Sequence, residues 1–151
     1  MSIEGKVALV TGATRGIGKA IAEELGRQGA VVVGTATSEN GAATIAQNLA
    51  GSGIKGTGLV LDVASQESVD QVLKTVQDDF GAIAIVVNNA GITRDNILMR
   101  MKDDEWDSVL NTNLSSIYRV AKGCLRGMTK ARWGRIINVS SVVASMGNAG
   151  Q

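Results

Sequence analysis

Three glycines near the N-terminus form the first group of residues whose types and spacing suit a chemical task. The segment Thr11–Gly18 (TGATRGIG) follows a short apolar run and precedes apolar residues at helical spacing. There, Gly12 permits a tight turn, Gly16 lets the backbone approach a phosphate, and Gly18 lets the helix pack closely on a sheet. Free N–H groups at the start of the helix would then bind the phosphates of a dinucleotide. A plain structural turn is the alternative interpretation.

Two further polar groups follow apolar runs later in the chain. Asn88-Asn89-Ala90-Gly91 comes after one run, and Ser140-Ser141 comes after the last. A hydroxyl at such a place can hydrogen-bond a ketone oxygen as the oxygen becomes an alkoxide during reduction. The alternatives are an ordinary turn for the asparagine segment and a serine that caps the end of a strand.

The elements that must position these groups alternate regularly. Buried strands are expected at Lys6–Thr11, Ala30–Thr35, Gly58–Val63, Ala82–Val87 and Arg135–Val139. Apolar residues at helical spacing predict helices from Ile17 to Gln28, from Ala42 to Leu49, from Val69 to Phe80 and from Trp106 to Leu125. This alternation predicts an α/β fold, a Rossmann-like doubly wound parallel sheet. We expect one dinucleotide-binding domain, 1–151, truncated after the fifth strand.

Composition excludes several classes of function. The chain has 151 residues, a net charge of +1, 44% hydrophobic residues and 19% charged residues. Nucleic acid and an anionic membrane surface are therefore not expected partners. The absence of histidine excludes metal sites built on histidine, and we expect no metal. A single cysteine, Cys124, fits a reducing cytoplasm, because it cannot form an internal disulfide.

The motif TGxxxGxG, the NNAG segment and the serine pair, in this order, resemble the short-chain dehydrogenase/reductase family. The resemblance covers the whole chain. The segments Gly34–Gly41, Asn88–Asn96 and Met99–Lys102 are similar to the bacterial branch that reduces 3-oxoacyl groups on acyl carrier protein in fatty-acid biosynthesis. Another short-chain reductase, for example one that acts on acetoacetyl-coenzyme A, and a non-catalytic nucleotide-binding module remain alternatives.

The cofactor favoured by the residues is NADP(H). No carboxylate stands at the end of the second strand before Glu39, so nothing repels a 2′-phosphate. Arg15 adds positive charge and Thr37 can donate a hydrogen bond, although Arg15 alone would also suit a solvated surface. The resemblance adds Asp62 and Val63, which would contact the adenine, while an ordinary turn is the alternative role for Asp62. The expected cofactor-binding residues are Gly12, Thr14, Arg15, Gly16, Ile17, Gly18, Thr37, Asp62, Val63, Asn89, Ala90 and Gly91.

The expected catalytic residues are Ser141 and Asn113. The resemblance selects Ser141 as the second serine of the pair. Asn113 interrupts an apolar stripe, where an unpartnered polar side chain costs about 1–3 kcal/mol. The resemblance implies that Asn113 lies at a helix distortion and holds a water in a proton relay; a satisfied core amide is the alternative.

The resemblance also implies partners and a proton donor. Arg132, in a basic cluster around Trp133, is a candidate contact for acyl carrier protein, and a homotetramer is expected for the full-length protein. The family's tyrosine–lysine pair, YxxxK, would fall shortly beyond Gln151. Tyr118 and Lys122 have this spacing on the wrong element. We therefore expect the 151 residues alone to bind cofactor without reducing a ketone.

Overall fold

The apolar runs form one parallel sheet. The computed structural model describes residues 2–151, and its strands are β1 (Val7–Val10), β2 (Val31–Ala36), β3 (Gly56–Val60), β4 (Ile83–Asn88) and β5 (Arg135–Asn138). The strand order is β3-β2-β1-β4-β5, and every pairing is parallel. The helices are α1 (Gly16–Arg27), α2 (Glu39–Gly51), α3 (Gln66–Phe80), η1 (Leu98–Arg100), α4 (Asp103–Leu110), η2 (Asn111–Ser115), α5 (Ser116–Ala131) and α6 (Val143–Met146). The predicted α/β doubly wound fold is confirmed.

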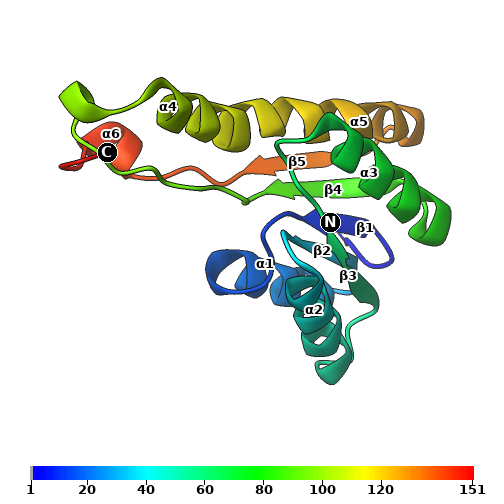
Figure 1. The fold of residues 1–151 in the computed structure, drawn as a ribbon. Helices are drawn as coiled ribbons and strands as arrows, with labels where there is room; N and C mark the ends of the chain where they lie inside the picture. The colour runs from blue at the N-terminus through cyan, green and yellow to red at the C-terminus, as the bar shows by residue number, and fades with distance from the viewer. Residues whose placement is uncertain (1) are drawn as a thin grey trace.

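The central strand β1 shows why the sheet needs helices on both sides. Val7 and Leu9 belong to a core cluster that includes residues of α3 and α5, whereas Ala8 and Val10 belong to a second cluster with residues of α1 and α2. Figure 1 shows these helix pairs on opposite faces of the sheet. Side chains alternate between the faces of a strand, so a strand covered on both faces reads as one apolar run.

The third strand lies earlier in the chain than predicted. The sequence predicted Gly58–Val63, but β3 runs from Gly56 to Val60 and places Asp62 in the turn before α3. The strand begins at Gly56 rather than at Gly58, and at Gly56 the neighbouring strand approaches too closely for a side chain. An ideal Cβ on Gly56 would lie 1.8 Å from the carbonyl oxygen of Val32.

The long helix predicted from Trp106 to Leu125 is distorted in its middle. The segment η2 is a π-helical turn between α4 and α5. The Ser116 hydroxyl, at the start of α5, donates a hydrogen bond to the carbonyl oxygen of Thr112 in this turn. The resemblance implied a distortion at Asn113, and the structure confirms it.

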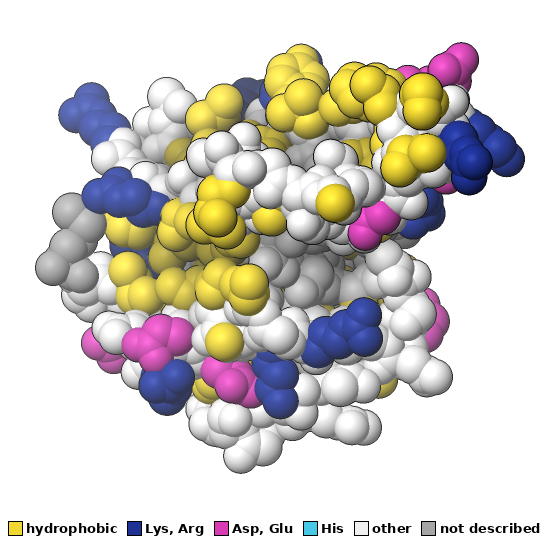
Figure 2. All heavy atoms as spheres, turned by 90° about the vertical axis from the view of Figure 1, so that its left-hand side faces the viewer, with side chains coloured by type: hydrophobic (Ala, Val, Ile, Leu, Met, Phe, Trp, Pro, Cys, Tyr) yellow, Lys and Arg dark blue, Asp and Glu magenta, His cyan; other side chains and the backbone are white. Residues whose placement is uncertain are grey.

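The last elements leave apolar surface exposed. All four residues of β5 are exposed, and β5 is an edge strand. The short helix α6 follows Ser141. Figure 2 faces the end of the molecule where η1 and α6 lie, and shows hydrophobic side chains on its upper part. Leu98, Met99, Val142 and Met146 are each more than two-thirds exposed. No helix within residues 2–151 is long and apolar enough to cross a membrane.

Candidate cofactor-binding site

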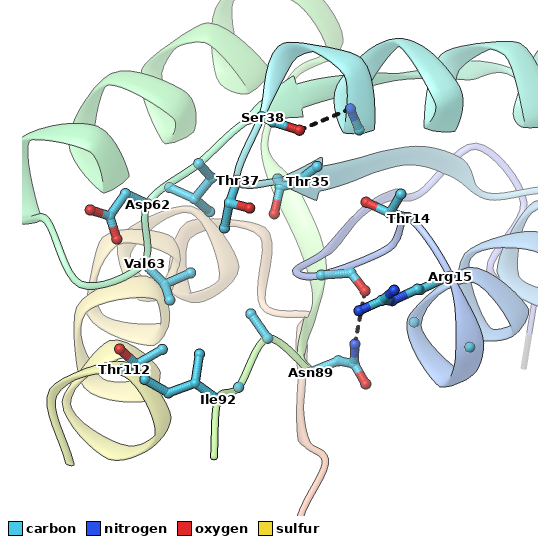
Figure 3. A pocket seen from close by; sticks show the side chains of 18 of the residues that line it. Thr14, Arg15, Thr35, Thr37, Ser38, Asp62, Val63, Asn89, Ile92 and Thr112 are labelled. Atoms are coloured by element: carbon cyan, nitrogen blue, oxygen red, sulfur yellow. Dashed lines mark hydrogen bonds between the residues drawn. The ribbon is translucent and has the colours of Figure 1, made fainter. Parts of the chain in front are cut away.

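A cleft of about 730 Å³ lies at the carboxyl ends of β1, β2 and β4. Figure 3 shows side chains from the turns after several strands pointing into it. All of the expected cofactor-binding residues line this cleft: Gly12, Thr14, Arg15, Gly16, Ile17, Gly18, Thr37, Asp62, Val63, Asn89, Ala90 and Gly91. The turns that the sequence singled out therefore meet at one edge of the sheet, where open α/β sheets bind ligands.

The turn after β1 needs its glycines for different reasons. Gly12 and Gly16 have φ of +66° and +57°, in the left-handed region that favours glycine. An ideal Cβ on Gly18 would lie 2.2 Å from the Gly12 carbonyl oxygen. An ideal Cβ on Gly16 would meet nothing within 4 Å, because Gly16 faces the open cleft. The turn is thus closely packed at Gly18 and open to the cleft at Gly16.

Asn89 and Thr11 tie the two central strands together at the cleft. The Asn89 side-chain amide donates to the carbonyl oxygens of Thr11 and Gly12, both at 3.1 Å. The buried Thr11 hydroxyl accepts hydrogen bonds from the main-chain N–H groups of Asn89 and Ala90, both at 3.0 Å. The asparagine segment after β4 therefore holds the glycine turn in place through these hydrogen bonds.

The N-terminus of α1 differs from those of α2 and α3. Ser38 and Ser65 cap α2 and α3 by accepting a hydrogen bond from a main-chain N–H of the first turn. At α1, the cap position is Arg15, whose side chain makes no capping bond, and the first turn contains no acidic residue. Within residues 2–151, no side-chain cap therefore satisfies the first N–H groups of α1, which lie at the cleft. Such a helix end binds anions.

The end of β2 carries hydroxyl groups. Thr37 and Ser38 line the cleft there, and Arg15 is its one basic residue within the described residues 2–151. Asp62, across the cleft, is exposed, and its Oδ1 accepts a hydrogen bond from the N–H of Ala64 at 2.9 Å. Asp62 therefore has the turn role that was its alternative interpretation, while it also lines the cleft.

Asn113 lies beside the cleft in the distorted turn. Its side-chain amide pairs with the main chain of Ile92: Nδ2 donates to the carbonyl oxygen and Oδ1 accepts from the N–H, both at 2.8 Å. An ideal Cβ on Gly91 would lie 3.3 Å from the same Oδ1. The amide is thus satisfied in this structure, and it holds the segment after β4 against the helix.

Ser141 follows β5 at the same edge of the sheet. The N–H of Val139 donates to the carbonyl oxygen of Asn88 at 2.9 Å, so the ends of β4 and β5 lie together. The Ser141 hydroxyl is exposed and accepts a hydrogen bond from the N–H of Val143 at 3.2 Å. Ser141 does not itself line the cleft described for residues 2–151.

The pair Tyr118 and Lys122, which has the YxxxK spacing, lies outside the cleft. Tyr118 and Lys122 line a second groove along the outer side of α5, where the Lys122 ammonium donates to the Tyr118 hydroxyl at 2.9 Å. This hydrogen bond raises the pKa of Lys122. Neither residue lines the cofactor cleft, as expected.

Arg132 lies at the other end of the molecule. It ends α5 in the left-handed conformation, with φ of +51°, and is followed by β5. It therefore stands at the amino end of the strands, opposite the cleft (Figure 1). The cations of Lys6 and Arg135 both stack on the neighbouring Trp133 ring, 4.8 and 4.9 Å from its centroid.

Sequence reasoning missed several residues of the cleft. They are Thr35, Ala36, Ser38, Gly41, Leu61, Ile92 and Thr112. Ser38 carried a readable signal, since a serine just before a helical pattern is a typical cap. Thr112 lies in the π-helical turn, and Ile92 is hydrogen-bonded to Asn113 of the same turn. Apolar periodicity does not predict such a turn. Within residues 2–151, no group of three or more histidine, cysteine, aspartate or glutamate residues is arranged to hold a metal ion.

Comparison with known proteins decides the family. A model described as short chain dehydrogenase matches residues 6–151. The chain belongs to this family. Relatives in the short chain dehydrogenase family include three proteins named 3-oxoacyl-[acyl-carrier-protein] reductase FabG, and the matches to them cover the whole chain. Identity is 68% for the Pseudomonas aeruginosa protein, 64% for that of Vibrio harveyi and 57% for that of Escherichia coli. The chain spans 61% of the length of each of these short chain dehydrogenases.

Proposed function

We propose that the protein, at its natural length, reduces 3-oxoacyl groups on acyl carrier protein to 3-hydroxyacyl groups with NADPH. The observation that carries the cofactor proposal is the N-terminus of α1, which has no side-chain cap and lies at the cleft. Gly16, in the adjoining turn, leaves open space that a side chain would occupy. The observation that carries the substrate proposal is the identity of at least 57% to relatives whose names state this reaction. A free, buried Cys124 supports the cytoplasm as the compartment.

The residues of the cleft fit NADPH. The N–H groups of Gly16, Ile17 and Gly18 would bind the pyrophosphate. Arg15, Thr37 and Ser38 would bind the 2′-phosphate, because no acidic residue lines this part of the described cleft. Asp62 and Val63 would lie beside the adenine, and Asn89, Ala90 and Gly91 would lie along the ribose and nicotinamide. When bound, NADPH supplies the hydride.

Ser141 and Asn113 are the residues that we assign to the substrate side. The Ser141 hydroxyl would donate a hydrogen bond to the ketone oxygen and stabilise the alkoxide that forms. It is free to do so because its bond in the structure uses its oxygen as an acceptor. Asn113 would hold the segment after β4 in place through Ile92 and position a water for proton transfer.

Carrier binding and assembly form the last part of the proposal. Arg132 is proposed to contact the acidic carrier protein, although it lies at the opposite end of the strands from Ser141. A homotetramer accommodates this separation if a carrier bound at Arg132 of one subunit delivers its acyl group to another. The outer groove of α5, with Leu114, Tyr118 and Leu125 exposed, offers an apolar surface for such assembly.

The test is turnover by the natural-length protein. NADPH oxidation is measured with a 3-oxoacyl-carrier-protein substrate and with acetoacetyl-coenzyme A. We expect faster turnover of the carrier substrate and a loss of kcat of roughly 10²–10³ in Ser141→Ala, with an unchanged Kd for NADPH. Ser145→Ala, an exposed serine in α6, is the matched control. Binding of NADPH without oxidation by the unaltered protein would contradict the proposed reaction and leave only nucleotide binding.

A further inference from the structure

Arg119 reaches from α5 to Val63, which lines the cofactor cleft, and to Asn111, which precedes the lining residue Thr112. Its Nη1 atom donates to the carbonyl oxygen of Val63 at 3.4 Å and to that of Asn111 at 3.2 Å. Its Nη2 atom donates to the side-chain oxygen of Asn111. Val63 belongs to the turn before α3, whereas Asn111 is the first residue of η2. One side chain therefore joins two segments that are far apart in the sequence.

The two segments carry different parts of the proposed site. Val63 lines the cleft beside Asp62, at the end assigned to the adenine. On the other wall, Asn111 is followed by Thr112, which lines the cleft, and by Asn113, which holds Ile92. Figure 3 shows Val63 and Asp62 on one element and Thr112 and Ile92 next to each other below them.

The chemistry of Arg119 suits a geometric role. Its side chain is half-buried, and among residues 2–151 it forms no ion pair. All of its acceptors are carbonyl or amide oxygens, so it binds dipoles rather than a carboxylate. The rigid, planar guanidinium can serve several acceptors at fixed angles, which a lysine ammonium cannot. Charge alone would therefore not replace it.

We propose that Arg119 is a positioning residue that couples the adenine wall of the cleft to the π-helical turn carrying Asn113. A ligand at the adenine end restricts the motion of Val63. Through its hydrogen bonds to Val63 and Asn111, Arg119 then restricts the motion of Asn111 and of the π-helical turn. Cofactor binding then holds Asn113 and Ile92 in the arrangement that the reaction needs. This inference rests on the proposed function, because it requires a dinucleotide in the cleft.

The test uses 2′,5′-ADP, the adenine half of NADPH, which lacks the nicotinamide end. Hydrogen exchange of the main-chain amides in residues 111–116 is measured with and without this ligand in the natural-length protein. In the unaltered protein, we expect the ligand to slow exchange there by about fivefold or more. In Arg119→Met, the ligand still binds but leaves the exchange of this segment unchanged. Arg126→Met, which removes an exposed arginine from the same helix, should behave as the unaltered protein does.

The outcomes separate this inference from the proposed function. Binding of 2′,5′-ADP with slowed exchange in Arg119→Met, or with no slowing in the unaltered protein, overturns the coupling role and leaves the cofactor assignment intact. Failure of the unaltered protein to bind 2′,5′-ADP overturns the cofactor assignment, and the coupling with it. If Arg119→Met does not fold, Arg119→Lys replaces it. That variant keeps the charge but lacks the planar group, so the same loss of coupling is expected, and retained coupling would contradict the proposal.

Discussion

The side-chain amide of Asn89 is hydrogen-bonded to the carbonyl oxygen of Gly12 at 3.1 Å. The same nitrogen lies 2.5 Å from the place where a Cβ on Gly18 would stand. One amide thus links the end of β4, the turn after β1 and the start of α1. The shape of the cleft depends on this contact, and two predictions follow from it.

Replacement of Asn89 by aspartate should destabilise the protein and weaken cofactor binding. Aspartate has nearly the same size, but its carboxylate would face two carbonyl oxygens in place of a donor. We expect a loss of about 3 kcal/mol in the free energy of unfolding, because the charged group loses hydrogen bonds and gains repulsion. Chemical denaturation and NADPH titration measure both effects. Asn40→Asp, at an exposed position in the first turn of α2, is the control for stability and should cause no loss in the free energy of unfolding. Equal losses of stability in the two variants would contradict the role of Asn89.

Alanine substitutions should separate the roles of Gly16 and Gly18, the two glycines in the first turn of α1. Gly18→Ala places a Cβ against main-chain atoms, so we expect a fall in thermal stability even without a ligand. Gly16→Ala has open space but a φ of +57°, so we expect a cost of only about 1 kcal/mol together with a clear loss of NADPH affinity. Melting curves and binding titrations are compared for both. Gly51→Ala, where nothing lies within 4 Å of the added Cβ, is the control. A larger loss of stability in Gly16→Ala than in Gly18→Ala would contradict the close packing at Gly18.

Arg15 and Thr37 should set the preference for NADPH over NADH. Arg15→Gln removes the positive charge of the cleft, so we expect about tenfold weaker binding of NADPH and little change for NADH. Thr37→Asp adds a carboxylate at the end of β2, and should reverse the preference by repelling the 2′-phosphate. Titrations with both cofactors measure the ratio of the two Kd values. Arg126→Gln is the matched control, and a parallel loss for both cofactors would argue against 2′-phosphate recognition.

Cys124 should make stability fall at high pH. Burial raises the pKa of its thiol to about 12 from the ordinary value of 9.0, because the thiolate loses solvation. The unfolded state therefore loses the proton first, and the contribution to stability is complete below pH 9.0 and lost as pH rises towards about 12. The free energy of unfolding is measured across this range in the unaltered protein and in Cys124→Ala. The difference between them should depend on pH only above pH 9.0, and a constant difference would contradict the buried thiol. Alkylation of Cys124 in the native state should also be slow until the protein is unfolded.

The alternation of strands and helices could be read from the sequence because each element keeps a simple period. The run VALV of β1 and the asparagine turn after β4 fell where expected. The boundary of β3 did not, because the strand begins at Gly56, where an ideal Cβ would lie 1.8 Å from the Val32 carbonyl oxygen. Gly58, the predicted first residue, lies further inside the strand and packs against α2. An ideal Cβ there would meet the carbonyl oxygen of Ala42 at 2.0 Å. A close approach between two elements leaves no mark in the hydropathy of either.

The site was predictable where main-chain turns build it, as at Gly12 and Gly91, and less so where tertiary contacts do. Asn113 was recognised only as a polar residue in an apolar stripe, and its partner Ile92 gave no signal at all. Arg119 looked like any charged residue of a helix, since its acceptors at Val63 and Asn111 are oxygens that every sequence provides.

The hydrogen bond between the Asn89 N–H and the Thr11 hydroxyl joins residues 78 positions apart in the chain. A contact over such a span forms slowly, because the intervening chain must first be brought back on itself. During synthesis on the ribosome, the glycine turn is made early, but it remains without its support until the chain beyond β4 has emerged. The dinucleotide that we propose for the cleft would therefore bind only a chain in which β1 and β4 have already paired, and its binding would report that this long-range step of folding is complete.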